Sequence, residues 1–156
     1  MTLYRKNVGI VVCKDGKVLL CARADQETYN WQFPQGGIEK GEDIVEAAKR
    51  ELFEETGIHS IRLIKVMPYS LKYDFPTNNN HKITGYKGQN QRWVCFEFLG
   101  DDSEINFKIN PEEVEFKAFE WADISEAQKR IIEFKKEVYI KVVDFFTQYV
   151  KETKHE

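Results

Sequence analysis

The chain has 156 residues, of which 42% are hydrophobic and 13% aromatic, a composition that suits one folded domain and excludes a disordered tail. Its net charge of −3 argues against a protein that coats nucleic acid by bulk attraction, so an anionic substrate needs local cations or a bound metal. No stretch reaches the roughly 20 apolar residues that span a bilayer, and no secretory segment precedes the first strand pattern. We therefore expect a cytoplasmic protein without a membrane partner.

Strand patterns dominate the first part of the chain. Apolar, β-branched runs at residues 8–12 and 18–21 flank Lys14-Asp15-Gly16, which predicts a β-hairpin. A short aromatic strand is expected at residues 31–33, where Pro34 ends it. Further strands are expected at residues 61–67, 71–73, 93–99 and 116–121.

Two longer helices are also expected. The first begins at Asp43, with Glu46 three residues on as a capping-box partner, and ends before Gly57. The second covers about residues 136–150, where apolar side chains recur at helical spacing and indicate a helix packed on the core. Ser125 is a candidate cap for a short helical turn before it.

These elements predict one α+β domain over residues 4–150, with a mixed β-sheet sandwiched between helices, followed by a frayed polar tail at residues 151–156. A long polar loop is expected over residues 74–89, the kind of segment that often carries binding function. The three cysteines lack metal-ligand spacing and lie in or beside apolar runs, so buried thiols are favoured over metal binding or catalysis.

The first expected helix carries glutamates on the side that should face the core. On a helical wheel with about 100° per residue, Glu51 and Glu55 fall in the apolar sector and Glu54 lies at its edge. Gathered like charges repel and are costly to desolvate, and a divalent cation such as Mg²⁺ or Mn²⁺ resolves this conflict. The alternative is an acidic face that is merely solvated. The apolar residues that define the sector are Ile44, Ala47, Ala48 and Leu52.

The segment before this helix strengthens the metal interpretation. Gly36 and Gly37 allow the backbone to approach a ligand closely, so a carbonyl of this loop can join the carboxylates. Nine positions together read G-x5-E-x7-R-E-L-x-E-E-x-G-I, and this segment resembles the Nudix box at every one of them. They are Gly36, Glu42, Arg50, Glu51, Leu52, Glu54, Glu55, Gly57 and Ile58.

The Nudix family hydrolyses nucleoside diphosphates linked to another moiety, using two or three Mg²⁺ ions for which Mn²⁺ can substitute. By position, the resemblance implies that Glu51, Glu54 and Glu55 hold the metals, helped by the backbone carbonyl of Gln35. Glu51 is the first choice for the general base and Glu54 the second.

Two further residues of the box have supporting roles by the same resemblance. Arg50 would pair with a box carboxylate and orient it. Glu42 would ligate a metal indirectly or brace the loop, and its alternative role is simply to favour the helix N-terminus.

Outside the box, the chain resembles bacterial RNA pyrophosphohydrolases, also described as dinucleoside polyphosphate hydrolases, over residues 4–150. Such enzymes remove pyrophosphate from a 5′-triphosphate RNA end, or act on a diphosphate end, and the resulting monophosphate exposes the RNA to decay. The resemblance rests on four further segments, Tyr4-Arg5-x-Asn7-Val8-Gly9-Ile10-Val11, Trp31-Gln32-Phe33-Pro34-Gln35-Gly36-Gly37-Ile38, Gly88-Gln89-x-Gln91-x-Trp93 and Phe134-Lys135-x-x-Val138-Tyr139.

This narrower resemblance assigns substrate contacts. Arg5 and Arg23 match arginines that contact phosphate, for which a planar guanidinium is suited. Tyr73, Phe134 and Lys135 match residues near the 5′ nucleotide, where an aromatic ring can stack on a base and a lysine can meet phosphate. The alternatives are a plain surface charge for Arg5 and a core position for Phe134.

Glu115 matches an additional acid that is linked to the metals or assists the base, although Glu112 and Glu113 leave the register open. Asn30 stands where the family commonly has a small hydroxyl residue, and the loop that carries His81 has no clear counterpart. Both departures concern RNA contacts and nucleotide preference, not hydrolysis. His81 is interpreted as a solvated loop histidine and not as a catalyst.

Two alternatives to RNA hydrolysis remain open. The same metal-binding helix serves the asymmetric cleavage of diadenosine tetraphosphate to ATP and AMP. A Nudix-like module that binds nucleotide or RNA without cutting is the other alternative, but such modules usually lack box carboxylates that this chain retains. No DNA partner is expected, and the sequence does not identify a protein activator.

Overall fold

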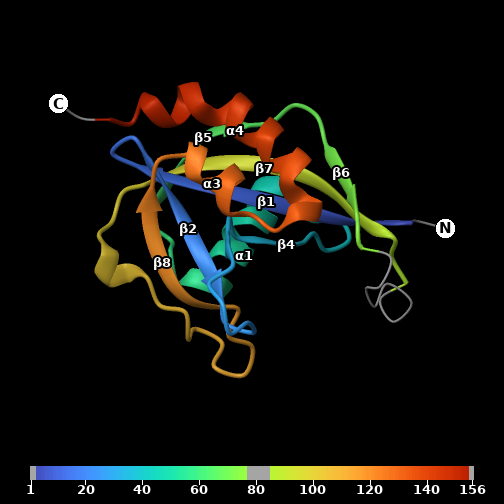
Figure 1. Ribbon diagram of the computed structural model, residues 1–156. Coiled ribbons are helices and arrows are strands. Elements are labelled where there is room, and N and C mark those ends of the chain that lie inside the picture. Colours follow the sequence, from blue (N-terminus) through green and yellow to red (C-terminus); the bar gives the residue numbers. More distant parts are fainter. Residues whose placement is uncertain (1–2, 77–84, 155–156) are drawn as a thin grey trace.

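A computed structural model describes residues 3–76 and 85–154, and it shows a mixed β-sheet with helices on both faces (Figure 1). The central strands are β1 and β7, which run parallel to each other, while the remaining strand pairs are antiparallel. The strands are β1 (Tyr4–Lys14), β2 (Lys17–Arg23), β3 (Trp31–Gln32), β4 (Gln35–Gly37), β5 (Ile61–Val66), β6 (Leu71–Asp74), β7 (Gly88–Phe98) and β8 (Phe116–Ala122).

The expected hairpin is confirmed, since β1 and β2 are joined by a two-residue turn. Asp15 and Gly16 have φ angles of 52° and 79°, and two successive positive φ values match the twist of an antiparallel hairpin. From this hairpin the sheet continues in the order β3-β2-β1-β7-β5, and β4, β6 and β8 pair with β1, β7 and β2.

The two faces of the sheet are both buried, which confirms the expected sandwich. Successive side chains of β1 point to opposite faces, so Val8, Ile10 and Val12 pack toward α1 (Ile44–Thr56). Val11 and Cys13 pack on the other face toward α4 (Lys136–Lys151). Figure 1 shows α3 (Ser125–Arg130) and α4 on one side of the sheet and α1 on the other.

Both ends of α1 lie where the sequence predicts them. The side chain of Asp43 accepts hydrogen bonds from the backbone N–H groups of Val45 and Glu46, which caps the N-terminus. Gly57, with a φ of 77°, ends the helix in the left-handed region that favours glycine. The Glu46 carboxylate, expected to complete a capping box, instead lies 3.8 Å from the ammonium of Lys49.

The structure differs from the expectation in four short segments. Residues 35–37 were expected as a loop but form β4, which pairs with β1; glycine is a poor strand former, so the sequence pattern does not reveal it. Ser125 is the first residue of α3 and not its cap, since its N–H donates to the carboxylate of Asp123 at 3.0 Å. Two short 3₁₀ turns, η1 (Asp102–Glu104) and η2 (Glu133–Lys135), add to the predicted elements.

Thr153, which was expected to lie in a frayed tail, is packed against the β1–β2 turn. Thr153 is only 4% exposed, and its hydroxyl accepts a hydrogen bond from the N–H of Gly16 at 3.0 Å. The hydroxyl also donates to the carbonyl of Val150 at 2.6 Å. The chain after α4 is therefore tied to the β1–β2 turn as far as Thr153.

Some expectations concern residues outside the described ranges. The loop with Asn78, Asn79, Asn80 and His81 falls within residues 77–84, so its interpretation is not tested. Within the described ranges, no helix combines the length and apolar content needed to cross a bilayer. Cys13, Cys21 and Cys95 are buried as free thiols.

Candidate active site

The glutamates of α1 are distributed as the helical wheel predicts. Glu55 is 8% exposed, and the side chain of Glu51 is 16% exposed, while that of Glu54 is 50% exposed. Since Ala47, Ala48 and Leu52 on the same helix are fully buried, the carboxylates of Glu51 and Glu55 share the face that packs toward the sheet.

Arg50 joins the acidic residues of the box to one another. Its Nε and Nη2 donate to the two carboxylate oxygens of Glu42 at 2.8 and 2.9 Å, and its Nη1 donates to Glu51 at 2.8 Å. Nη2 also donates to the carbonyl of Gly37 at 3.0 Å, and Glu54 lies 3.5 Å from Nη1. The expected pairing of Arg50 with a box carboxylate is thus present in the geometry. The guanidinium holds the pKa of Glu42 at about 2.

Gly36 allows β4 to lie directly against α1. A Cβ atom built on Gly36 would lie 2.2 Å from the carboxylate of Glu51, a separation that real Cβ atoms do not tolerate. Any side chain at this position would therefore displace Glu51 or separate the strand from the helix. The close approach of β4 to Glu51 therefore explains why this position of the motif is a glycine.

Glu55 is the least compensated charge of the site. Its Oε2 atom is buried and has no hydrogen-bond partner within the described residues. Burial raises the pKa of Glu55 well above its usual value, and the charges of Glu51 and Glu115 raise it further, while Arg23 lowers it. Burial likewise raises the pKa of Glu51, against the opposing effect of Arg50.

A buried polar network fixes Gln35, whose backbone carbonyl is a predicted metal ligand. Asn7 is fully buried, and its side-chain N–H donates to the side-chain carbonyl of Gln35 at 2.7 Å. Gln91 in turn donates to the side-chain carbonyl of Asn7 at 2.8 Å. The sequence reasoning did not assign a role to Asn7 or Gln91, because their contact depends on the parallel pairing of β1 and β7.

The predicted substrate residues gather beside these glutamates. The rings of Tyr73 and Phe134 lie 5.8 Å apart, and the ammonium of Lys135 lies 5.7 and 5.8 Å from their centres. Burial raises the pKa of Tyr73 to about 12, and the charges of Arg5 and Arg23 oppose this rise. Burial and the charge of Arg23 lower the pKa of Lys135 to about 8. The structure therefore brings all five residues into one region.

Arg23 connects this group to Glu115. The guanidinium of Arg23 forms a two-hydrogen-bond pair with Asp25, at 3.0 and 2.9 Å, and lies 3.8 Å from the carboxylate of Glu115. The charge of Glu115 also acts on Glu55, whereas Glu113 contacts Asn110 at 3.4 Å. The geometry favours Glu115 over its neighbours as the additional acid.

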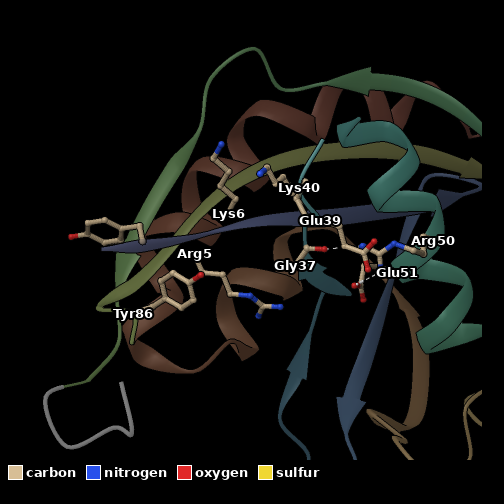
Figure 2. Close-up of a pocket in the computed structure, with 10 residues that line it drawn as sticks. Arg5, Lys6, Gly37, Glu39, Lys40, Arg50, Glu51 and Tyr86 are labelled. Carbon is tan, nitrogen blue, oxygen red and sulfur yellow. Dashed lines mark hydrogen bonds and ion pairs between the residues drawn. The ribbon is translucent and has the colours of Figure 1, made fainter. Parts of the chain in front are cut away.

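An open pocket of about 580 Å³ borders Glu51 and Arg50. Figure 2 shows Arg5 and Lys6 on opposite sides of β1, with Lys40 on the same side as Lys6. The sequence reasoning identified Arg5 but neither lysine, because the pocket forms only when β1, β4 and the segment before α1 come together. Its remaining wall residues are Tyr4, Gly37, Ile38, Glu39 and Tyr86.

The donors around α1 suit divalent cations in their chemistry. Carboxylate oxygens are the ligands that Mg²⁺ and Mn²⁺ prefer, and the buried, unpartnered oxygen of Glu55 is a donor that a cation would satisfy. Across residues 3–76 and 85–154, however, no three acidic, histidine or cysteine side chains are preassembled as a metal cage.

Known proteins are similar to this chain over most of its length. The model of the NUDIX domain family matches residues 3–142. An RNA pyrophosphohydrolase from Bartonella henselae is 44% identical, with 92% of this chain and 90% of that protein covered, and one from Caulobacter vibrioides is 41% identical, with 95% and 88% covered.

Solved structures share the fold at lower sequence identity. The Escherichia coli dihydroneopterin triphosphate pyrophosphohydrolase superposes with a TM-score of 0.69 at 21% identity, covering 92% of this chain and 99% of that one. A Caenorhabditis elegans Ap4A hydrolase superposes with a TM-score of 0.60 at 17% identity, covering 91% and 98%. With its box intact and the family model matched over most of its length, this chain belongs to the Nudix family.

Proposed function

We propose that this Nudix enzyme hydrolyses the pyrophosphate linkage at the 5′ end of RNA. A triphosphate end would release pyrophosphate and a diphosphate end would release phosphate, leaving a 5′-monophosphate in both cases. The observation that carries the proposal is the convergence of the glutamates of α1 with three cations, Arg5, Arg23 and Lys135, around one region. RNA is favoured as the substrate because the two relatives described above are RNA pyrophosphohydrolases, and the match to this chain covers 88–90% of their length.

The catalytic roles are carried over from the Nudix box, and of the box carboxylates Glu51 also lines the pocket. Glu51, Glu54, Glu55 and the backbone carbonyl of Gln35 would hold two or three Mg²⁺ ions, with Mn²⁺ as a substitute. When bound, these ions neutralise phosphate charge and acidify water. Glu51 is the proposed general base, since it lines the pocket wall, and Glu54 is the alternative. Glu115 would assist from the loop before β8.

The remaining residues would bind and orient the substrate. Arg5, Arg23 and Lys135 supply positive charge for the phosphates, and a guanidinium can contact two phosphate oxygens at once. Tyr73 and Phe134 present aromatic rings beside Lys135, which suits contact with a base. Arg50 would hold Glu51 in place through its simultaneous hydrogen bonds to Glu42 and Gly37, as expected of a positioning residue.

The experiment is a comparison of substrates with one enzyme preparation. We expect kcat/KM in Mg²⁺ to be higher for 5′-triphosphorylated or 5′-diphosphorylated RNA than for diadenosine tetraphosphate. Activity should be lost in EDTA and in Glu54→Gln, whereas Glu46→Gln, an exposed change on the same helix, should retain it. A higher kcat/KM for diadenosine tetraphosphate would contradict the RNA assignment, and activity that persists in EDTA would contradict the mechanism.

A further inference from the structure

We propose that a second groove, contiguous with the pocket at Glu51, binds backbone phosphates of RNA downstream of the cleaved end. This proposal rests on the proposed function, because it requires that the substrate continue beyond its first nucleotides. The groove has a volume of about 450 Å³, and the polar residues in its wall that carry the argument are Lys6, Lys40, Ser70, Asn90 and Arg92. We call it the Lys6–Arg92 groove.

The groove and the pocket at Glu51 are neighbours that share part of their wall. Lys6, Ile38, Glu39 and Lys40 line both, so a chain that leaves the pocket passes between these residues into the groove. Lys6 and Lys40 extend on the same side of β1 in Figure 2, while Arg5 extends on the opposite side toward Gly37. Alternation along β1 thus directs Arg5 to the reacting phosphates and Lys6 to the exit path.

The wall of the groove holds polar atoms that the described residues do not satisfy. The Nε atom of Arg92 and the Oδ1 atom of Asn90 are buried and have no hydrogen-bond partner there. The contact of Arg92 Nη2 with the carbonyl of Met67 is long, at 3.4 Å. Leaving buried donors and acceptors unpaired costs free energy. The Arg92 Nε–H can donate to a phosphate oxygen of RNA, whereas Asn90 Oδ1 is an acceptor that a ribose 2′-hydroxyl, and not a phosphate, would satisfy.

The charge of the groove matches a polyanion. Lys6, Lys40 and Arg92 contribute three positive charges, against Glu39 and Glu42 in the same wall. Glu42 is already engaged by two hydrogen bonds from Arg50, which leaves a positive balance on a protein whose net charge is −3. A local cluster of cations on an acidic protein favours binding of phosphates at one defined place.

The position of the groove favours RNA over an acidic protein segment. Its opening joins the pocket in which the 5′ end would be held, so the next phosphates of the same strand reach it without a second binding event. A dinucleoside polyphosphate has no phosphates beyond its second nucleoside and would not occupy it. The groove would therefore make the enzyme prefer RNA of several nucleotides over short substrates.

The test compares a 5′-triphosphorylated RNA of ten nucleotides with a 5′-triphosphorylated dinucleotide, using Arg92→Gln, Lys40→Gln and the wild type. For the longer RNA we expect KM to rise by about fivefold per variant. The dependence of log KM on log salt should weaken by about 0.7 for each lost phosphate contact. For the dinucleotide, Arg92→Gln should leave kcat and KM unchanged. Lys141→Gln, an exposed change on α4, is the matched control.

A variant that should lower KM tests whether a higher KM in the other variants reflects a damaged fold. Glu39→Gln removes a negative charge from the wall and should lower KM for the longer RNA, which damage to the fold cannot do. Equal effects of Arg92→Gln on both substrate lengths, or an unchanged KM for the longer RNA in Arg92→Gln and Lys40→Gln, would overturn the proposal. The second of these results would assign the groove to another occupant, such as an acidic protein segment.

Direct binding separates this proposal from the proposed function. A 5′-monophosphorylated RNA of ten nucleotides, labelled at its 3′ end, can be titrated by fluorescence anisotropy without any hydrolysis. If the wild type cleaves no RNA end, the proposed function fails, and the groove is still supported when Arg92→Gln weakens this binding about fivefold. Binding that is as tight in Arg92→Gln as in the wild type would reject the groove.

Discussion

At the scale of single residues, Glu55 is a buried carboxylate that lowers the stability of the fold and that we propose is retained for catalysis. The carboxylate lies on a buried helix face next to Ala48 and Leu52, with one oxygen that has no hydrogen-bond partner among the described residues. A buried charge without a partner is among the most unfavourable features that a fold can retain. Its presence beside Glu51, whose pKa is also raised by burial, supports the proposal that these groups share cations.

Removing this charge should stabilise the fold and abolish activity. In Glu55→Gln we expect the free energy of unfolding to rise by about 1–3 kcal/mol, because the neutral amide avoids the desolvation of a carboxylate. We expect kcat in Mg²⁺ to fall at least a hundredfold, since loss of groups that only support metal ligands already costs about 10–100-fold. Urea unfolding and steady-state kinetics measure the two effects. A variant that is less stable and fully active would contradict both interpretations.

Lys135 gives the site a dependence on alkaline pH. Its pKa is lowered to about 8 by burial and by Arg23, so the ammonium is present at pH 7 and is lost as the pH rises through this value. Because a neutral amine no longer attracts phosphate, we expect KM for RNA to rise by about five- to tenfold between pH 7 and 9. Lys135→Met should have a raised KM at pH 7 and a flatter profile. Identical pH profiles in the two proteins would remove Lys135 from substrate binding.

The sequence predicts some of these residues better than others. Glu51, Glu54 and Glu55 could be grouped because they lie on one helix, where spacing alone determines which side chains are neighbours. Asn7, Lys6 and Lys40 could not, because their roles depend on which strands and loops pack together. Arg50 lies between these cases, since its pairing with Glu51 is local but its contact with Glu42 spans the turn before α1.

At the scale of elements, the site depends on the contact between β4 and α1. β4 was not predicted as a strand, yet its pairing with β1 holds Gln35 and Gly36 against the helix that carries the glutamates. The α-helix itself could be predicted closely, because Asp43 and Gly57 mark its ends. A strand of three residues with two glycines has no comparable pattern in the sequence.

Closing the space at Gly36 should disturb catalysis more than folding. In Gly36→Ala the new methyl group would lie 2.2 Å from the Glu51 carboxylate, so we expect kcat to fall about 10–100-fold as this carboxylate is displaced. The free energy of unfolding should fall by about 1–3 kcal/mol from overpacking. Gly100→Ala is the matched control, because the nearest atoms to its methyl group would be the end of the Glu104 side chain and the Phe98 ring, away from the site. Unchanged kcat in Gly36→Ala would contradict the role of this contact.

At the scale of the whole molecule, the sheet is buried on both faces. The proposed catalytic glutamates belong to α1, the helix that covers one of these faces. This sandwich could be predicted from alternating strands and two amphipathic helices. The order of the strands could not, because the parallel pairing of β1 with β7 joins segments about half the chain apart. The packing of Thr153 was also missed, since a lone threonine in a polar segment forms no pattern that predicts burial.

The contact of Thr153 with the β1–β2 turn should contribute to stability alone. In Thr153→Val the N–H of Gly16 loses its acceptor, so we expect the free energy of unfolding to fall by about 1 kcal/mol with kcat/KM unchanged. Thr147→Val is the matched control, because its hydroxyl bonds only within α4, to the carbonyl of Val143. Equal unfolding midpoints for Thr153→Val and the wild type would show that this contact contributes nothing.

The central claim is that divalent cations bind among the glutamates of α1 and hold the phosphates of the substrate there. The most direct measurement is an anomalous scattering map of crystals that contain Mn²⁺ and a 5′-triphosphorylated RNA analogue resistant to hydrolysis. We predict anomalous peaks in contact with carboxylates of Glu51, Glu54 or Glu55, with the phosphates of the analogue beside them and Arg5. An ordered analogue with no anomalous peak next to these carboxylates would contradict the account.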